Sequence, residues 1–214
     1  MEVRIRRYMY EPIYKAFQSA ALLSDAVDAH LHGDVVGAKR LLVEADIDEI
    51  RAWQWPIESK LPWKRLSNEP LSLLKQARAK PRHPTGATRQ IVIDRDGYHC
   101  RFCGLPVISS DVRKCLSVLY GEAIPWSRKF HECHAGFQCL TMSFDHVLPH
   151  ERGGTSDPEN IVVACGPCNY ARMSFTLREV EVDHPLKHPS YTRHWFGYDR
   201  WDGLTRLLAS GSES

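Results

Sequence analysis

The feature that most constrains this chain is a pair of short cysteine motifs that lie far apart in the sequence. Residues 100–103 read Cys-Arg-Phe-Cys and residues 165–168 read Cys-Gly-Pro-Cys. A two-residue gap lets two thiolates reach one ion from a tight turn, and two such pairs complete the tetrahedron of a structural zinc site. The sequence therefore predicts one Zn²⁺ ion held by four ligands: Cys100, Cys103, Cys165 and Cys168.

The other cysteines and the start of the chain bear on the cellular compartment. The chain has 7 cysteines, and an odd number without a signal sequence argues against a disulfide framework. Residues 1–7 are basic, but no apolar block of about 7 or more residues follows them, as a secretory signal would require. No apolar run approaches the roughly 18 residues of a membrane helix. We therefore predict a cytoplasmic protein that has no membrane partner.

Length and patterning suggest a catalytic unit with an appendage. The 214 residues are 43% hydrophobic and 25% charged, as in ordinary globular proteins. Apolar residues recur at helical spacing over residues 10–50, and prolines interrupt residues 51–86. We expect a helical N-terminal subdomain and connector over residues 1–86, a central domain over 87–182 with an insertion at 104–143, and a C-terminal cap with a frayed tail over 183–214.

The expected elements of the central domain are short. Residues 87–99 should contain a short helix that ends at Gly97, because glycine commonly terminates helices. The remaining predictions are a short helix at Leu71–Ala79, strands over 144–150 and 161–164, and a helix from Cys168 to about Glu181, with Pro167 suited to its first turn.

Charge and tryptophan are concentrated just before the central domain. The net charge of the chain is only +2, but acidic residues exceed basic ones by five over residues 25–50. Basic residues exceed acidic ones by six over residues 51–82, where Trp53, Trp55 and Trp63 also lie. This segment is either an arm that faces nucleic acid, since tryptophan stacking and phosphate contacts often occur together, or a packed connector with solvated charges.

The stretch before the second cysteine motif carries the chemistry. A strand should deliver the adjacent Asp145 and His146, and Gly153-Gly154 permits a sharp turn. Asn169 follows directly on Cys168, so the zinc site would hold it in place. The carboxylate and amide oxygens suit Mg²⁺ or Mn²⁺, and a neutral histidine can accept a proton from water. Together they provide what phosphodiester hydrolysis requires.

These motifs resemble those of the HNH nuclease family, the ββα-metal nucleases. The matching elements are both cysteine motifs, Asp145-His146 with Pro149, Gly153-Gly154, Asn160, and Cys168-Asn169-x-x-Arg172. The resemblance covers about residues 88–180. It implies an α+β fold, with a ββα-metal HNH core and a structural zinc, preceded here by a mostly helical N-terminal subdomain.

The resemblance also implies a role for each residue. His146 would be the general base, and Asp145 and Asn169 would hold the catalytic Mg²⁺ or Mn²⁺. Asn160 would belong to the catalytic set by keeping His146 aimed. Arg172 would contact a phosphate, unless it is a simple surface charge. His150 would assist in binding a phosphate or a second metal, unless it only lines the rim of the site.

The insertion is longer than the resemblance leads us to expect. It contains His131, Cys133, His134 and Cys139, which either build a second metal site or belong to a variable loop with small buried cysteines. The spacing His-x-Cys-His is cramped, which favours the loop.

Two classes of function remain open at this stage. One is a DNA endonuclease, and the biological role suggested for it is that of an effector in a bacterial restriction or antiphage system, paired with an ATPase through its N-terminal helices. The other is a non-catalytic zinc module that binds nucleic acid or a protein. In the C-terminal region, Trp195, Phe196, Trp201 and Leu204 should pack back as a cap, with stacking on DNA as the alternative.

Overall fold

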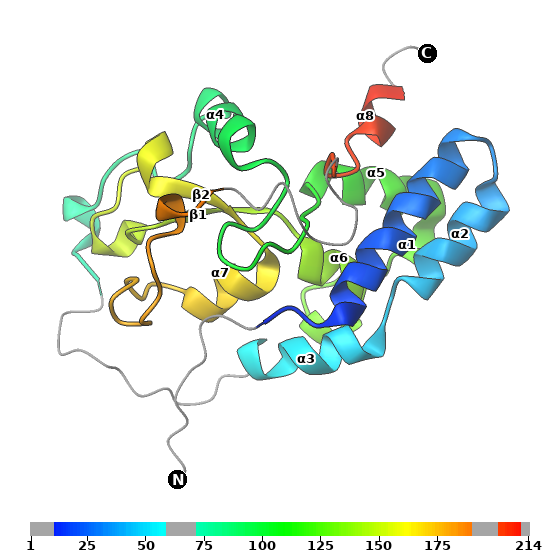
Figure 1. Cartoon of the computed structure of the whole chain (residues 1–214), viewed down its shortest axis with the longest axis horizontal. Coiled ribbons are helices and arrows are strands. Elements are labelled where there is room, and N and C mark those ends of the chain that lie inside the picture. The colour runs from blue at the N-terminus through cyan, green and yellow to red at the C-terminus, as the bar shows by residue number, and fades with distance from the viewer. Residues whose placement is uncertain (1–10, 59–71, 190–200, 211–214) are drawn as a thin grey trace, which may run out of the picture.

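The protein combines many helices with one small sheet, as the predicted α+β class requires (Figure 1). A computed structural model describes residues 11–58, 72–189 and 201–210. The helices are α1 (Tyr14–Leu31), α2 (Val35–Glu44), α3 (Asp48–Glu58), α4 (Gly86–Asp96), α5 (Ser110–Tyr120), α6 (Ala135–Leu140), α7 (Gly166–Arg172) and α8 (Arg206–Ser210), and the strands are β1 (Ser143–His146) and β2 (Ile161–Ala164).

The sheet and the helix after it form a ββα unit. Strand β1 pairs antiparallel with β2, so that Ser143 faces Ala164 and His146 faces Ile161. All four residues of β2 are buried, as its unbroken apolar sequence leads one to expect. The strand predicted over 144–150 is shorter in the structure: β1 ends at His146, and a 3₁₀ turn occupies residues 150–152.

Helix α7 starts earlier and ends sooner than predicted. Pro167 lies in its first turn, where the missing N–H costs nothing. The helix ends at Arg172 because Met173 adopts a positive φ of 50°. Gly166 is required at the start, since a Cβ there would lie 2.6 Å from the carbonyl oxygen of Gln138. Helix α7 is thereby pressed against the end of α6.

The predicted helix before the first cysteine motif is present as α4. It begins after Thr85, whose side chain accepts a hydrogen bond from the Thr88 N–H, and it ends at Gly97. Asp96, in its last turn, is fully buried and accepts a hydrogen bond from the backbone N–H of Val163 at 3.0 Å. This contact fixes α4 to the middle of β2.

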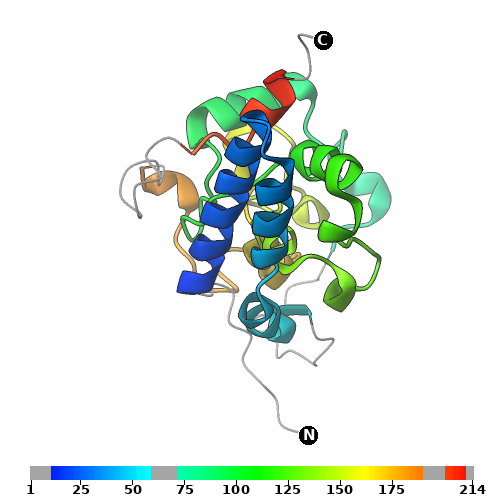
Figure 2. The ribbon, with the colours of Figure 1, turned by 90° about the vertical axis from the view of Figure 1, so that its right-hand side faces the viewer.

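The N-terminal helices pack onto the rest of the chain rather than standing apart. Helix α1 buries one apolar face, and α2 lies beside it (Figure 2). Helix α6 lies between α1 and α7, which joins the helical part to the ββα unit (Figure 1). One apolar core runs from Ala16 to Leu207. Because this core crosses residues 86 and 182, the division into domains stays a prediction.

The favoured prediction for the insertion, a variable loop, is wrong. It forms α5 and α6, and both contribute buried apolar side chains to the core. His134 caps α6: its Nδ1 accepts from the Phe137 N–H at 3.2 Å, so its Nε2 donates to the Leu42 carbonyl at 2.9 Å. His134 therefore has a structural role that ties the insertion to α2.

A second metal site in the insertion is not supported. Both ring nitrogens of His134 are already hydrogen-bonded. Burial raises the pKa of the Cys139 thiol well above its usual value, which keeps it protonated and apolar. In the described part of the chain, the only group of three or more metal-binding side chains close enough to share an ion is the set of four motif cysteines.

The connector differs in detail from the prediction. Helix α3 continues through Pro56 to Glu58, and the helix expected at Leu71–Ala79 is a single 3₁₀ turn at Lys75–Ala77. Trp53 packs partly buried against the core. Trp63 and the side chain of Trp55 lie outside the described residues.

Two of the four residues expected to form a C-terminal cap, Trp201 and Leu204, pack back onto the core as predicted. Trp201 is buried and its indole N–H donates to the carbonyl of Val107 at 2.9 Å, while Leu204 is fully buried. Trp195 and Phe196 lie outside the described residues. Every helix in the described part of the chain is too short or too polar to span a lipid bilayer.

Candidate active site

The four motif cysteines meet in one place. Their sulfurs all lie within 4.8 Å of one another, and those of Cys103 and Cys165 are 3.7 Å apart. Zn–S bonds of about 2.3 Å in a tetrahedron put the sulfurs about 3.8 Å apart. Three of the cysteines are buried and Cys103 is half-buried. The number, type and spacing of the donors fit a closed structural zinc site.

The backbone explains how each motif presents its two sulfurs. In the first, the Cys100 carbonyl accepts from the Gly104 N–H at 2.8 Å, which closes the tight turn. In the second, the Cys165 carbonyl accepts from the Asn169 N–H at 3.0 Å, as the first bond of α7. Asn169 is thus fixed directly by the second cysteine motif.

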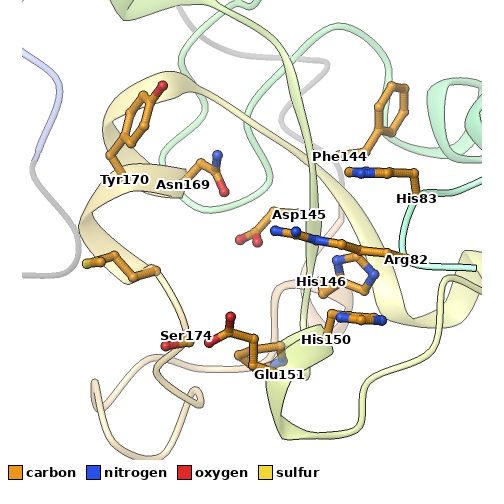
Figure 3. Close-up of a pocket in the computed structure, with 12 residues that line it drawn as sticks. Arg82, His83, Phe144, Asp145, His146, His150, Glu151, Asn169, Tyr170 and Ser174 are labelled. Atoms are coloured by element: carbon orange, nitrogen blue, oxygen red, sulfur yellow. The ribbon is translucent and has the colours of Figure 1, made fainter. Parts of the chain in front are cut away.

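An open pocket of about 440 Å³ lies beside β1 and α7. The structure brings Asp145 and His146 from β1 and Asn169 from α7 to this pocket, where Arg82 and His83 of the connector also lie (Figure 3). A pocket of this size is typical of small-molecule and cofactor sites. The three side chains singled out from the sequence therefore share one cavity.

Asp145 is buried and held by an arginine. Its Oδ2 accepts hydrogen bonds from Nε and Nη2 of Arg172 at 3.0 and 2.5 Å. Burial raises the pKa of the Asp145 carboxyl, and the charge of Arg172 opposes this. The pair keeps a carboxylate in place at the wall of the pocket.

Arg172 does not have the role that the resemblance implied. Its side chain is 2% exposed, and besides Asp145 it donates to three backbone carbonyls, those of His146, Val147 and Phe175. Together these contacts use all five N–H groups of a guanidinium. Arg172 has no donor left for a phosphate, and it is not a surface charge either: it fastens α7 to β1.

Asn169 offers a side-chain amide oxygen in addition to the carboxylate oxygens of Asp145. Its Nδ2 lies 3.4 Å from the hydroxyl of Ser143, and its amide oxygen points toward the Asp145 carboxylate (Figure 3). A carboxylate and an amide oxygen are hard donors of the kind that Mg²⁺ and Mn²⁺ take up alongside water and phosphate oxygens. The two residues present fit one such cation.

His146 is held in its neutral form. Its pKa is lowered to about 4, first by burial and then by the nearby positive charges of His150, Arg172, His83 and Arg82. The usual value is about 6.5. At neutral pH the imidazole is therefore uncharged, with one ring nitrogen protonated and the other able to accept a proton.

Asn160 organises the loop between the strands. Its Oδ1 accepts from the Leu148 N–H at 2.8 Å, and its Nδ2 donates to the carbonyls of Leu148 and Thr155 at 3.1 and 2.7 Å. Gly154 is required beside it, since a Cβ there would lie 1.7 Å from the Leu148 carbonyl oxygen. Asn160, predicted within the catalytic set, thus acts on the loop that follows His146 and not on the reacting atoms.

His150 lines the same pocket. Its ring centroid is 5.7 Å from that of His146, and its Nε2 lies 2.7 Å from the carbonyl oxygen of Ala79, to which it donates. Its contact with a substrate phosphate stays a prediction.

The sequence interpretation missed the wall that the connector provides. Figure 3 shows the guanidinium of Arg82 reaching into the pocket, with His83 beside it. Ser156 contacts both His146 and this connector. The basic excess over residues 51–82 was a signal for Arg82, but nothing in the local sequence connects it with Asp145.

Comparison with known proteins identifies the central part of the chain. Residues 132–181 match the model of a family described as HNH endonuclease. This stretch holds β1, β2, α7 and the second cysteine motif, so the ββα unit is the part of the chain that is similar to the HNH endonuclease family, as the resemblance predicted. No curated protein and no solved structure matches the chain.

Proposed function

We propose that the protein is a metal-dependent endonuclease that hydrolyses phosphodiester bonds in DNA. The observation that carries this proposal is the pocket in which the oxygens of Asp145 and Asn169 lie beside a neutral His146. The match to the HNH endonuclease family supports the same activity.

The chemistry follows from what each side chain offers. Asp145 and Asn169 would hold the Mg²⁺ or Mn²⁺ ion, which when bound stabilises negative charge on the phosphate and the leaving oxygen. His146 takes a proton from the attacking water, whose oxygen then bonds to phosphorus. The P–O3′ bond breaks, giving a 5′-phosphate and, after protonation from solvent, a 3′-hydroxyl, as the resemblance implies.

The connector offers positive charge for the nucleic acid strand. Of the basic residues in this segment, Arg78 lies 3.5 Å from the Glu151 carboxylate, whereas Arg82 lines the pocket. We infer that Arg82 binds a phosphate of the substrate. Lys60, Lys64 and Arg65 lie outside the described residues.

Fewer of the N-terminal apolar residues are open to a protein partner than the sequence suggested. The apolar face of α1 is buried in the protein's own core. Helix α2 leaves Val35, Val36 and Val43 exposed, Val36 at 82%. We infer that any partner, such as the ATPase of a defence system, binds there. The defence role itself stays a prediction from the sequence.

Cleavage of supercoiled plasmid by the zinc-loaded full chain tests the proposed activity. We expect cutting in Mg²⁺ or Mn²⁺ and none in excess EDTA after a short exposure that leaves zinc bound. His146→Ala should cut about 10²–10⁴ times more slowly, the usual contribution of general base catalysis. His131→Ala, an exposed histidine outside the pocket, is the matched control and should cut like the wild type.

The alternative function predicts a different outcome of the same assay. A non-catalytic zinc module would leave the plasmid intact in every metal, while still retarding it in a gel. Equal cutting by wild type and His146→Ala would instead remove His146 from the mechanism.

A further inference from the structure

Ser156 stands between His146 and the connector. Its Oγ lies 3.1 Å from Nε2 of His146, and 2.9 and 3.1 Å from the carbonyl oxygens of Pro81 and Arg82. Three polar atoms therefore surround one hydroxyl, which has a single hydrogen to donate.

The two carbonyls decide where that hydrogen goes. A carbonyl oxygen only accepts, so the single Ser156 hydrogen must point to the Pro81 and Arg82 carbonyls, which share it in a bifurcated hydrogen bond, because otherwise the lone pairs of the hydroxyl would face theirs. The hydroxyl then accepts from His146, which must carry its proton on Nε2. A hydrogen bond at one ring nitrogen of a histidine sets the state of the other in this way. Nδ1 is left with a free lone pair, since among the described residues the hydrogen bond of the His146 ring is the one at Nε2.

We propose that Ser156 is a positioning residue of the active site, and that it selects the His146 tautomer whose Nδ1 accepts the proton of the attacking water. This inference rests on the proposed nuclease function and specifies the atom at which His146 acts. Ser156 itself touches neither the water nor the phosphate.

The connector is an integral part of this device. It is fastened to the loop that carries Ser156, because the Leu73 N–H donates to the Glu151 carbonyl at 2.6 Å and His150 donates to the Ala79 carbonyl at 2.7 Å. Residues 72–84 lie outside the stretch that matches the HNH endonuclease family. The chain thus completes its active site with a segment that precedes the first cysteine motif.

The test is the tautomeric state of His146, read from long-range ¹H–¹⁵N correlation spectra of zinc-loaded protein without Mg²⁺ or Mn²⁺. The wild type should show the proton on Nε2. Ser156→Ala should show a mixture of both tautomers, and Ser156→Thr, which keeps the hydroxyl, should show the wild-type pattern. Thr155→Ala is the matched control, since its side chain is exposed on the same loop.

Cleavage kinetics supply the second readout. Ser156→Ala should lower kcat about 10-fold to 100-fold, the range seen when a partner that orients a metal-bound histidine is removed, with little change in KM. Ser156→Thr should restore kcat. In the background of His146→Ala, the Ser156→Ala change should cost nothing further.

The spectra separate this inference from the nuclease proposal. A proton on Nδ1 of wild-type His146 would overturn the inference whether or not the protein cuts DNA, and so would an unchanged tautomer in Ser156→Ala. Inactive wild-type protein with the proton on Nε2 would overturn the nuclease proposal and, with it, the catalytic meaning of the tautomer.

Discussion

The cysteine cluster and the pocket are built on the same hairpin and helix, yet they are opposite kinds of site. The cluster gathers four sulfurs and is almost wholly buried, so a zinc ion there has no place left for a substrate. The pocket offers two oxygens and a neutral imidazole and is open to solvent. Closed sites contribute stability and open ones catalyse. We therefore expect damage to the cluster to unfold the protein, and damage to the pocket to stop only the reaction.

Arg172 connects the two sites. Its guanidinium lies 5.6 Å from the ring centroid of Phe102, within the first cysteine motif, and it is bonded to Asp145 at the pocket. A change at this residue should accordingly affect both stability and activity.

The largest effect should come from the cysteine cluster. Cys165→Ser removes one ligand, and structural zinc supplies on the order of 10 kcal/mol in small zinc domains. We expect the zinc content to fall from one ion per chain toward none, and the cooperative thermal transition seen by circular dichroism to disappear. Cys115→Ser, a half-buried cysteine outside the cluster, should keep both. A folded, zinc-free Cys165→Ser protein would contradict the scaffold role of this site.

Arg172→Met should have the next largest effect, a loss of stability. It removes a buried charge and leaves the Asp145 carboxylate without its partner, which costs about 3–5 kcal/mol in the free energy of unfolding. Urea denaturation measures this loss, and zinc content should remain at one ion per chain. If stability were unchanged and only DNA affinity fell, Arg172 would be a phosphate ligand after all.

Asn169→Ala should affect the pocket alone. Loss of the amide oxygen should raise the Mg²⁺ concentration at half-maximal cleavage by about 10-fold, which corresponds to about 1.4 kcal/mol of binding free energy. Asn169→Asp keeps an oxygen there and should bind the cation at least as well as the wild type. Loss of zinc or of thermal stability in Asn169→Ala would show that the two sites are not separable.

The smallest effect concerns pH. Because the pKa of His146 is about 4, the cleavage rate at saturating cation should stay level as pH falls from 8 through the usual histidine value of about 6.5. Arg82→Ala removes a positive charge that lowers this pKa, so the rate should begin to fall at a higher pH, by less than about one unit. A wild-type rate that halves near pH 6.5, or a variant that falls at lower pH, would contradict this electrostatic picture.

The elements that short-range patterns specify were predicted well. The cysteine pairs, the glycine that ends α4 and the apolar run of β2 each act within a few residues, and the structure has all three where they were expected. Asn169 reaches the pocket for the same reason, since it follows Cys168 directly.

What the sequence did not predict depends on contacts between distant segments. Arg172 reads as a surface charge until α7 is packed against β1, which buries all of its N–H groups. From the sequence alone the insertion resembles a loop, because the surface on which α6 packs is formed by α1 and α3, which are distant in the sequence. Likewise, Ser156 has no evident role until the Pro81 carbonyl is brought to within 2.9 Å of it.

The most direct test of the central claim is where a paramagnetic cation binds. Mn²⁺ added below one equivalent to ¹⁵N-labelled, zinc-loaded protein should broaden the ring signals of His146 first and leave those of His134, buried against α2, sharp. In Asn169→Ala, the same broadening of the His146 signals should require about 10-fold more Mn²⁺. Broadening that spares His146 in the wild type, or that needs no more Mn²⁺ in Asn169→Ala than in the wild type, would contradict a cation site formed by Asp145 and Asn169 beside the proposed general base.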